Sequence, residues 1–411
     1  MPGGVVCILL IVISYLLKFL QSFSKVKTVI KAVEKSKILK ADRNILQRLV
    51  IAYKAGRDVD LGRILKHELL PVPIAIADTS GSLKSGNKAV ILDDVLRDVE
   101  VGVRVDNDND SSALVIDGQA SVQSFKTHGM KTFGDFADEF VSTVFRKGNA
   151  YSRIDVLFDR YRDLSIKSGT RTRRAKGKQP VRRVIENKEV PLPTNFSAFL
   201  SLNENKKDLA ALLSEEIVLQ APTGKTIVTT GVFADEDGVK CNNDNIYLSG
   251  LKVSHEEADT RIVLHAIHCS QVSAIVISAS DTDVLLLLVS FYSEINRRLW
   301  MVAVSSSKPK NIPIHAVVEK NFPSLDRRKH LVAFRALTGC DTTSFFYGIS
   351  KKSALKVYRD NYELLEGLGE GDLTDQMIKD CEKFVYLVLI VLDESTAFNI
   401  EGYEKKENDL K

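Results

Sequence analysis

The chain has 411 residues, of which 44% are hydrophobic and 27% charged, and its formal net charge is +4. These values predict a globular protein with one large domain or two smaller ones, and the total charge alone does not indicate a nucleic-acid partner. The five cysteines are odd in number and form no CxxC pair, which argues against a disulfide framework and predicts an intracellular protein of the nucleus or cytoplasm.

The N-terminal segment, residues 1–25, contains an uncharged apolar run at residues 5–17. It is shorter than the roughly 20 residues of a membrane span. A membrane anchor reaching to residue 20, a signal-like segment and a buried helix all remain open. Lys18, Lys25 and Lys27 follow the run, so an anchor would leave the rest of the chain in the cytosol.

Residues 26–112 are predicted to form a helical and loop extension. Apolar residues recur at roughly helical spacing over residues 26–75, and a polar Gly/Ser/Lys and DNDNDSS stretch follows. Asp106, Asp108 and Asp110 resemble the start of a calcium loop, but the glycine at its sixth position and the glutamate at its twelfth are missing. We therefore assign them to a solvated loop.

From residue 113 onward, strand-like and helix-like segments alternate. This pattern predicts an α/β fold with a central twisted, mostly parallel sheet and helices on both faces. The expected strands are 113–116, 154–158, 226–233, 274–277 and 299–304, and the expected helices are 133–145, the second half of 191–218, 256–269 and 284–292.

Seven carboxylates stand in five clusters, most of them just after an apolar run. They are Asp117, Asp159, Glu257, Asp259, Asp281, Asp283 and Asp341. Because parallel strands end at one edge of a sheet, these side chains are expected to meet there. An all-oxygen cluster favours Mg²⁺ or Mn²⁺. Each acid also has a structural alternative, since Asp281, Asp283, Asp341 and Glu257 could cap helices.

A basic stretch begins directly after Asp159. It has ten basic residues against the single acid Asp163, and these are Arg160, Arg162, Lys167, Arg171, Arg173, Arg174, Lys176, Lys178, Arg182 and Arg183. A solvated loop is one explanation, but the position beside the acids favours phosphate binding.

Several potential zinc ligands also crowd together. His255, His265, His268 and Cys269 lie within one stretch, and His265 and Cys269 would share a helix face. Because further ligands are missing, we do not predict a zinc site there.

The order of VIDG, VLFD, EEAD, SDTD and GCDTT resembles the flap endonuclease branch of the PIN-like nuclease superfamily. The resemblance implies a nuclease domain at 113–360 with a basic arch-like insert at 160–190, a helix-hairpin-helix-like element at 341–360 and a C-terminal tail at 361–411. The chain is also similar to animal proteins, often of mobile-element character, that share the EEADTR and LTGCDTTS signatures.

The resemblance implies structure-specific endo- or exonuclease activity by two-metal-ion hydrolysis, with DNA rather than RNA as the expected substrate. Asp117, Asp159, Glu257 and Asp259 would hold one Mg²⁺, and Asp281, Asp283 and Asp341 a second. Lys167 and Arg174 would stabilise the transition state. The expected nucleic-acid contacts are Arg160, Arg162, Arg171, Arg173, Lys176, Lys178, Gly348, Ser350, Lys351 and Lys352.

Two features depart from that family. More than a hundred residues precede Asp117, which puts recognition of a 5′ end in doubt, and Ser350 stands where the family usually has a second glycine. A catalytically inactive nucleic-acid-binding or scaffold protein, possibly tethered to a membrane, remains the alternative.

Overall fold

The structure is a computed structural model, and the residues whose placement it describes form two compact units. One unit is Leu92–Lys329, and the other combines Met1–Ile91 with His330–Lys411. The described residues are 27–31, 36–40, 51–52, 54–57, 75–78, 82–84, 86–102, 111–161, 181–231, 238–255, 257–269, 271–303, 310–340 and 343–389.

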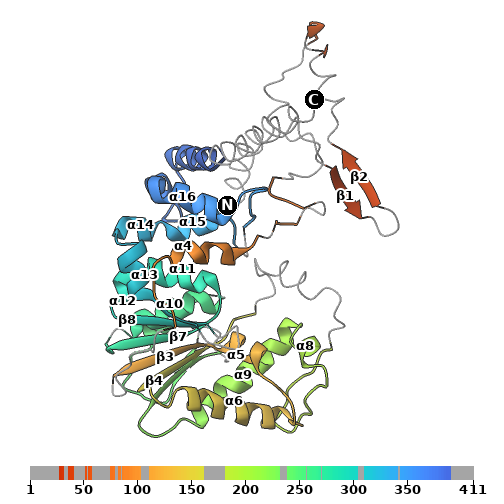
Figure 1. Cartoon of the computed structure of the whole chain (residues 1–411). Coiled ribbons are helices and arrows are strands. Elements are labelled where there is room, and N and C mark those ends of the chain that lie inside the picture. The colour runs from red at the N-terminus through yellow and green to blue at the C-terminus, as the bar shows by residue number, and fades with distance from the viewer. Residues whose placement is uncertain are drawn as a thin grey trace, which may run out of the picture. The chain divides into compact units, whose positions relative to one another are not determined.

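The unit Leu92–Lys329 is built on a seven-stranded sheet in the order β6-β5-β4-β3-β7-β8-β9. Figure 1 shows the neighbouring strands β4, β3, β7 and β8 of this sheet. The strands are β3 (Ser112–Asp117), β4 (Arg153–Leu157), β5 (Thr226–Thr230), β6 (Val239–Cys241), β7 (Ala274–Ser278), β8 (Arg298–Ala303) and β9 (Lys310–Pro313). The five central strands are parallel, and β6 and β9 pair antiparallel at the two edges. The predicted mostly parallel sheet is therefore confirmed.

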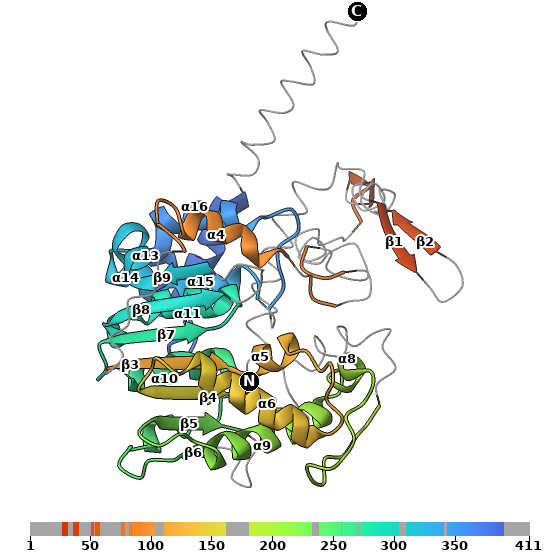
Figure 2. The same ribbon diagram turned by 60° about the horizontal axis from the view of Figure 1, so that its bottom comes forward.

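Helices cover both faces of this sheet (Figure 2). Its helices are α4 (Leu92–Val95), α5 (Gly118–Ser124), α6 (Phe133–Lys147), α8 (Phe196–Phe199), α9 (Asn203–Leu219), η2 (Ser249–Leu251), α10 (Ala258–His268), α11 (Thr282–Ser290), α12 (Tyr292–Ile295), α13 (Ile314–Asn321) and α14 (Leu325–Lys329). Helix α10 packs on β3, β4 and β7, while α9 packs on β5 and against α6.

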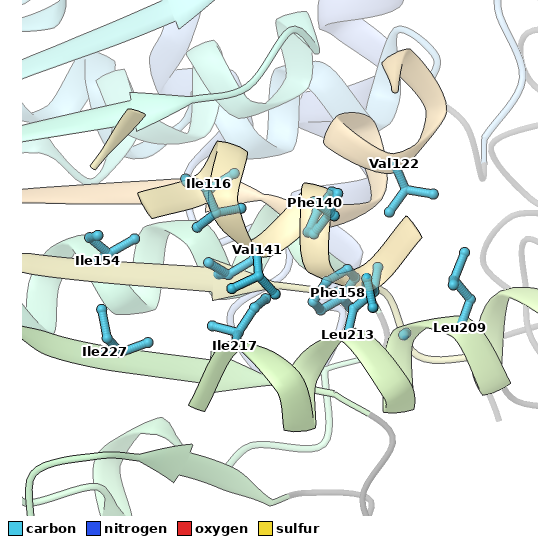
Figure 3. Packing of buried hydrophobic residues seen from close by; sticks show 14 of the residues in the cluster. Ile116, Val122, Phe140, Val141, Ile154, Phe158, Leu209, Leu213, Ile217 and Ile227 are labelled. Carbon is cyan, nitrogen blue, oxygen red and sulfur yellow. The ribbon is translucent and has the colours of Figure 1, made fainter. Parts of the chain in front are cut away.

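The core on the α6 and α9 face is made of alternate strand residues and the apolar sides of those helices. Ile116, Ile154 and Ile227 of three neighbouring strands lie on the side of the sheet where Val141 of α6 and Ile217 of α9 pack (Figure 3). Each of these five side chains is at most 1% exposed. The burial of this face holds the strand ends, and therefore the residues that follow them, in fixed positions.

The two edge strands were not predicted from the sequence. Strand β6 has three residues and β9 has four, and each contains a lysine. Short, charged edge strands protect a sheet from pairing with other chains, but they leave little periodic signal in the sequence.

The helical prediction for residues 26–75 is wrong at its beginning. Residues Lys27–Lys31 (β1) and Ser36–Lys40 (β2) pair as an antiparallel two-stranded sheet. Val29 and Ile30 are β-branched, and such residues favour extended backbone over helix. Residues 51, 52 and 54 are helical as expected.

The second unit contains η1 (Lys88–Ile91), α15 (Leu331–Leu337), α16 (Lys351–Asn361), η3 (Tyr362–Leu365) and a helix over residues 375–389. The rings of Phe334 on α15 and Tyr358 on α16 are 4.8 Å apart, so these helices pack directly on each other. Within the described ranges, no helix has the length and apolar character needed to cross a membrane. The apolar run at residues 5–20 lies outside those ranges.

Candidate metal and nucleic-acid site

The strand order places the candidate site at the point where the sheet changes direction. After β3, the chain adds β4 and β5 on one side, and it then returns to place β7 on the other side of β3. In open α/β sheets, ligands bind outside the carboxyl ends of the strands at this reversal. Asp117 is the last residue of β3, and Asp281 follows the end of β7 by three residues.

Asp117 is partly buried and interacts with two other acids. Its Oδ1 accepts a hydrogen bond of 2.8 Å from the backbone N–H of Ala120 at the start of α5. Burial raises the pKa of Asp117 to about 7, the Ala120 hydrogen bond opposes the rise, and the negative charges of Asp159 and Asp281 add to it. Asp159 and Asp281 follow the carboxyl ends of β4 and β7, the two strands that pair with β3, so the three carboxylates lie at one edge of the sheet.

The glycine after Asp117 leaves room for the ring of Phe158. A Cβ built on Gly118 would lie 2.7 Å from this ring, which belongs to the residue that precedes Asp159. A larger residue at position 118 would therefore displace the Phe158 ring, next to the two strand ends where Asp117 and Asp159 lie.

Asp159 connects the end of β4 to helix α10. Its Oδ1 accepts a hydrogen bond of 2.9 Å from the backbone N–H of Ala258, the first residue of the helix. Glu257 occupies the N-cap position but makes no side-chain capping bond, so the predicted capping role for Glu257 is not seen. Glu257 and Asp259 therefore lie at the helix end that Asp159 contacts, and both are partly buried.

Asp281 caps α11 by accepting a 2.9 Å hydrogen bond from the backbone N–H of Asp283. The capping explanation for Asp281 thus applies, although it does not prevent the carboxylate from lying near Asp117. Asp283 is only 1% exposed. Asp341 lies outside the described residues.

We call Asp117, Asp159 and Asp281 the acidic edge. In the described part of the chain, no lysine or arginine forms an ion pair with any of the three. No three His, Cys, Asp or Glu side chains among the described residues are arranged to hold a metal ion as they stand. The donors nevertheless suit a hard cation, because they are all carboxylate oxygens and a cation would relieve their mutual repulsion.

Arg261 is a buried residue beside the acidic edge that sequence reasoning missed. It is 0% exposed, and its guanidinium donates to Thr230 Oγ1 at 2.7 Å and to the carbonyl oxygen of Phe158. The EEADTR motif contains Arg261, and an arginine one turn after two acids on an apolar helix was the available signal.

The structure describes few of the predicted phosphate-binding residues. Arg160 is 3% exposed and donates to the carbonyl oxygen of Val253, so its side chain is not presented to a ligand here. Arg182 is more exposed and pairs with Asp208 at 2.8 Å. The remaining predicted contacts of this stretch lie outside the described residues, namely Arg162, Lys167, Arg171, Arg173, Arg174, Lys176 and Lys178.

The predicted hairpin element lies in the second unit, between α15 and α16. Gly348 has a φ of +75°, which a glycine adopts without strain, and Ser350 caps α16 by accepting from the N–H of Ser353 at 3.0 Å. Lys351 is only 3% exposed, and its Nζ lies 5.3 Å from the centre of the Phe345 ring. Lys351 is thus buried in this structure, whereas Lys352 is partly exposed.

The histidines at the end of α10 belong to a buried network with β4. Asp155, which is 0% exposed, accepts two hydrogen bonds from Arg153, and its Oδ2 lies 2.6 Å from His265 Nδ1. His268 Nδ1 lies 3.0 Å from Arg153 and its Nε2 lies 2.9 Å from the carbonyl oxygen of Tyr247, so both its nitrogens have partners.

No protein-family model matches the chain, and no curated protein sequence matches it. One similar solved structure is a bacteriophage T5 flap endonuclease in a pseudo-enzyme–product complex with DNA and metal ions, with 14% identity and a TM-score of 0.37. Two further T5 structures, one co-crystallised with metal ions and one 5′-exonuclease with zinc bound, each have 14% identity and a TM-score of 0.36. Each alignment covers 69% of this chain and 89% of the other. We therefore base the function on the residues of this chain.

Proposed function

We propose that the unit Leu92–Lys329 is a divalent-metal-dependent phosphodiesterase that cleaves nucleic acid, with DNA as the preferred substrate. The observation that carries the proposal is the meeting of Asp117, Asp159 and Asp281 at the carboxyl ends of β3, β4 and β7, where the strand order reverses. Ligand sites of open α/β sheets lie at such a reversal, and clustered carboxylates there bind hard cations.

Asp117, Asp159 and Asp281 would hold Mg²⁺ or Mn²⁺, and Glu257, Asp259 and Asp283 remain proposed as further ligands. When bound, such an ion lowers the pKa of a coordinated water and neutralises charge on the phosphate. The basic residues that follow Asp159 would attract the phosphate backbone without reading base sequence. Lys167 and Arg174 remain the proposed residues that stabilise charge on the reacting phosphate.

One observation favours a second candidate, a nucleic-acid-binding protein without catalysis. Asp117 and Asp281 each accept a hydrogen bond from a helix N-terminus, and the described residues contain no ready-made group of three metal ligands. In that case the acids would serve only as helix caps. The two candidates differ in whether the protein turns over substrate.

Purified full-length protein incubated with end-labelled branched DNA or the matching RNA, in Mg²⁺ or in chelator, separates them. We expect Mg²⁺-dependent cleavage of the DNA, and its loss in Asp281→Ala. Asp244→Ala is the matched control, because Asp244 is an exposed acid that follows β6 at the opposite edge of the sheet. Binding without cleavage would support the second candidate, and undiminished cleavage by Asp281→Ala would contradict the proposed site.

A further inference from the structure

Arg261 has the surroundings of a residue that organises the acidic edge. It is a fully buried arginine on α10, and a charged guanidinium is costly to bury unless its donors are used. Its acceptors lie at the ends of two neighbouring strands, Thr230 at the end of β5 and Phe158 just beyond the end of β4. One side chain therefore ties α10 to both strands at the edge where the acids gather.

The bond to Phe158 reaches the position directly before Asp159. Asp159 itself accepts a hydrogen bond from Ala258, three residues before Arg261 on the same helix. The exit of β4 is therefore fixed to α10 by two hydrogen bonds that the helix donates, one from the backbone of Ala258 and one from the Arg261 side chain. The backbone just before Asp159 is held by Arg261, and the Asp159 carboxylate is held by Ala258. The Asp159 side chain therefore has little conformational freedom.

We propose that Arg261 is a positioning residue for the acidic edge, holding Asp159 where it can share a divalent cation with Asp117 and Asp281. The inference deepens the proposed function and rests on it, because it takes the acidic edge as a cation site. Residues that hold metal ligands in place from behind typically change metal affinity 10- to 100-fold when they are replaced.

The positive charge of Arg261 and its positioning of Asp159 have opposite effects on cation affinity. A nearby positive charge repels a cation, so removing the charge would strengthen binding, whereas loosening Asp159 would weaken it. Arg261→Lys keeps the charge and loses the fork of donors that reaches both acceptors. Arg261→Gln removes the charge as well, so the two variants separate positioning from repulsion.

The test is Mn²⁺ binding to the full-length protein, measured from the signal of unbound Mn²⁺ in electron paramagnetic resonance. We expect Arg261→Lys to weaken Mn²⁺ binding about 10-fold or more. Arg328→Lys is the matched control, because Arg328 is also buried and donates to one hydroxyl, Ser293 Oγ, and to the backbone carbonyls of Phe322 and Pro323, which follow α13. It should leave Mn²⁺ affinity unchanged.

Arg261→Lys that binds Mn²⁺ as tightly as the unsubstituted protein does would overturn the inference, because this variant keeps the charge and changes only the positioning. If the Arg261 variants do not fold, as judged by near-ultraviolet circular dichroism, Thr230→Val decides, because it removes one acceptor and keeps Arg261. Loss of that hydrogen bond should weaken binding about fivefold, and unchanged binding would count against the inference. Unsubstituted protein that binds no Mn²⁺ would instead refute the proposed function.

Discussion

Asp155 and Asp117 lie on adjacent parallel strands, yet their surroundings differ completely. Burial disfavours the charged form of Asp155, but Arg153 and His265 outweigh it and lower the pKa of that carboxyl. Asp117 is partly buried, and this burial, together with the negative charges of Asp159 and Asp281, raises its pKa to about 7. A carboxylate that is paired with basic side chains of the same protein, such as Asp155, stabilises the fold. A carboxylate near other carboxylates, such as Asp117, is suited to binding a metal cation.

The largest effect on stability is expected from breaking the buried network of Arg153, Asp155 and His265. Asp155→Ala would leave the buried Arg153 guanidinium without its partner, and removing one side of a buried pair costs about 3 to 5 kcal/mol. Chemical denaturation should show this loss in the free energy of unfolding. The double variant Arg153→Met/Asp155→Leu should recover much of it, and a double variant no more stable than Asp155→Ala would contradict this account.

In the acidic edge, removing a carboxylate charge should stabilise the protein, whereas Asp155→Ala destabilises it. Because the pKa of Asp117 is raised from 3.8 to about 7, its favourable contribution is complete below pH 3.8 and is lost as the pH rises through 7. Asp117→Asn removes that dependence and keeps the helix cap. Without divalent cations, we expect this variant to be more stable than the unsubstituted protein at pH 8, by roughly 1 to 4 kcal/mol, with the difference shrinking toward pH 4.

Denaturation of both proteins at several pH values in chelator measures this difference. Adding Mg²⁺ at pH 8 should stabilise the unsubstituted protein and leave Asp117→Asn unaffected. Equal stabilisation of both by Mg²⁺ would place the cation elsewhere.

A smaller dependence of stability on pH is expected from His265 in the buried network with Asp155. Burial lowers the pKa of His265, although Asp155 opposes this, so the folded protein prefers the neutral imidazole. The sign of the shift means that its contribution is present above the unfolded pKa near 6.5 and is lost as the pH falls below it. His265→Gln should flatten this part of the stability profile below pH 6.5 in thermal unfolding, and an unchanged slope would contradict the assignment.

The smallest effect on stability should come from Asp281→Asn. Asparagine caps a helix about as well as aspartate, so the free energy of unfolding should change by less than about 0.5 kcal/mol. Cleavage in Mg²⁺ should nevertheless fall strongly, because the amide is a poor ligand for a hard cation. Loss of both stability and activity would instead indicate a structural role.

The sequence contained most of the fold and part of the site. Asp117, Asp159 and Asp281 could be found because each follows an apolar strand, and the parallel sheet then brings them to one edge. Asp155 and Arg261 could not be interpreted from spacing, because the partner His265 of Asp155 and the partner Thr230 of Arg261 come from other parts of the chain. The two edge strands were missed since they are too short for a periodic pattern.

The residues of the basic stretch show a second limit. Position beside Asp159 predicted that Arg160 binds phosphate, but burial is decided by packing, and its guanidinium donates to the Val253 carbonyl instead. The early helical prediction failed for a related reason, because residues 27–31 and 36–40 pair with each other and an isolated pattern cannot show that pairing.

The central claim is that the acidic edge binds a divalent cation. Anomalous diffraction from crystals of the full-length protein grown with Mn²⁺ tests it most directly. We predict a Mn²⁺ peak bounded by Asp117, Asp159 and Asp281, and its loss in Asp117→Asn. Crystals that show Mn²⁺ only at other positions, with the three carboxylates still turned to their helix N-termini, would contradict the account.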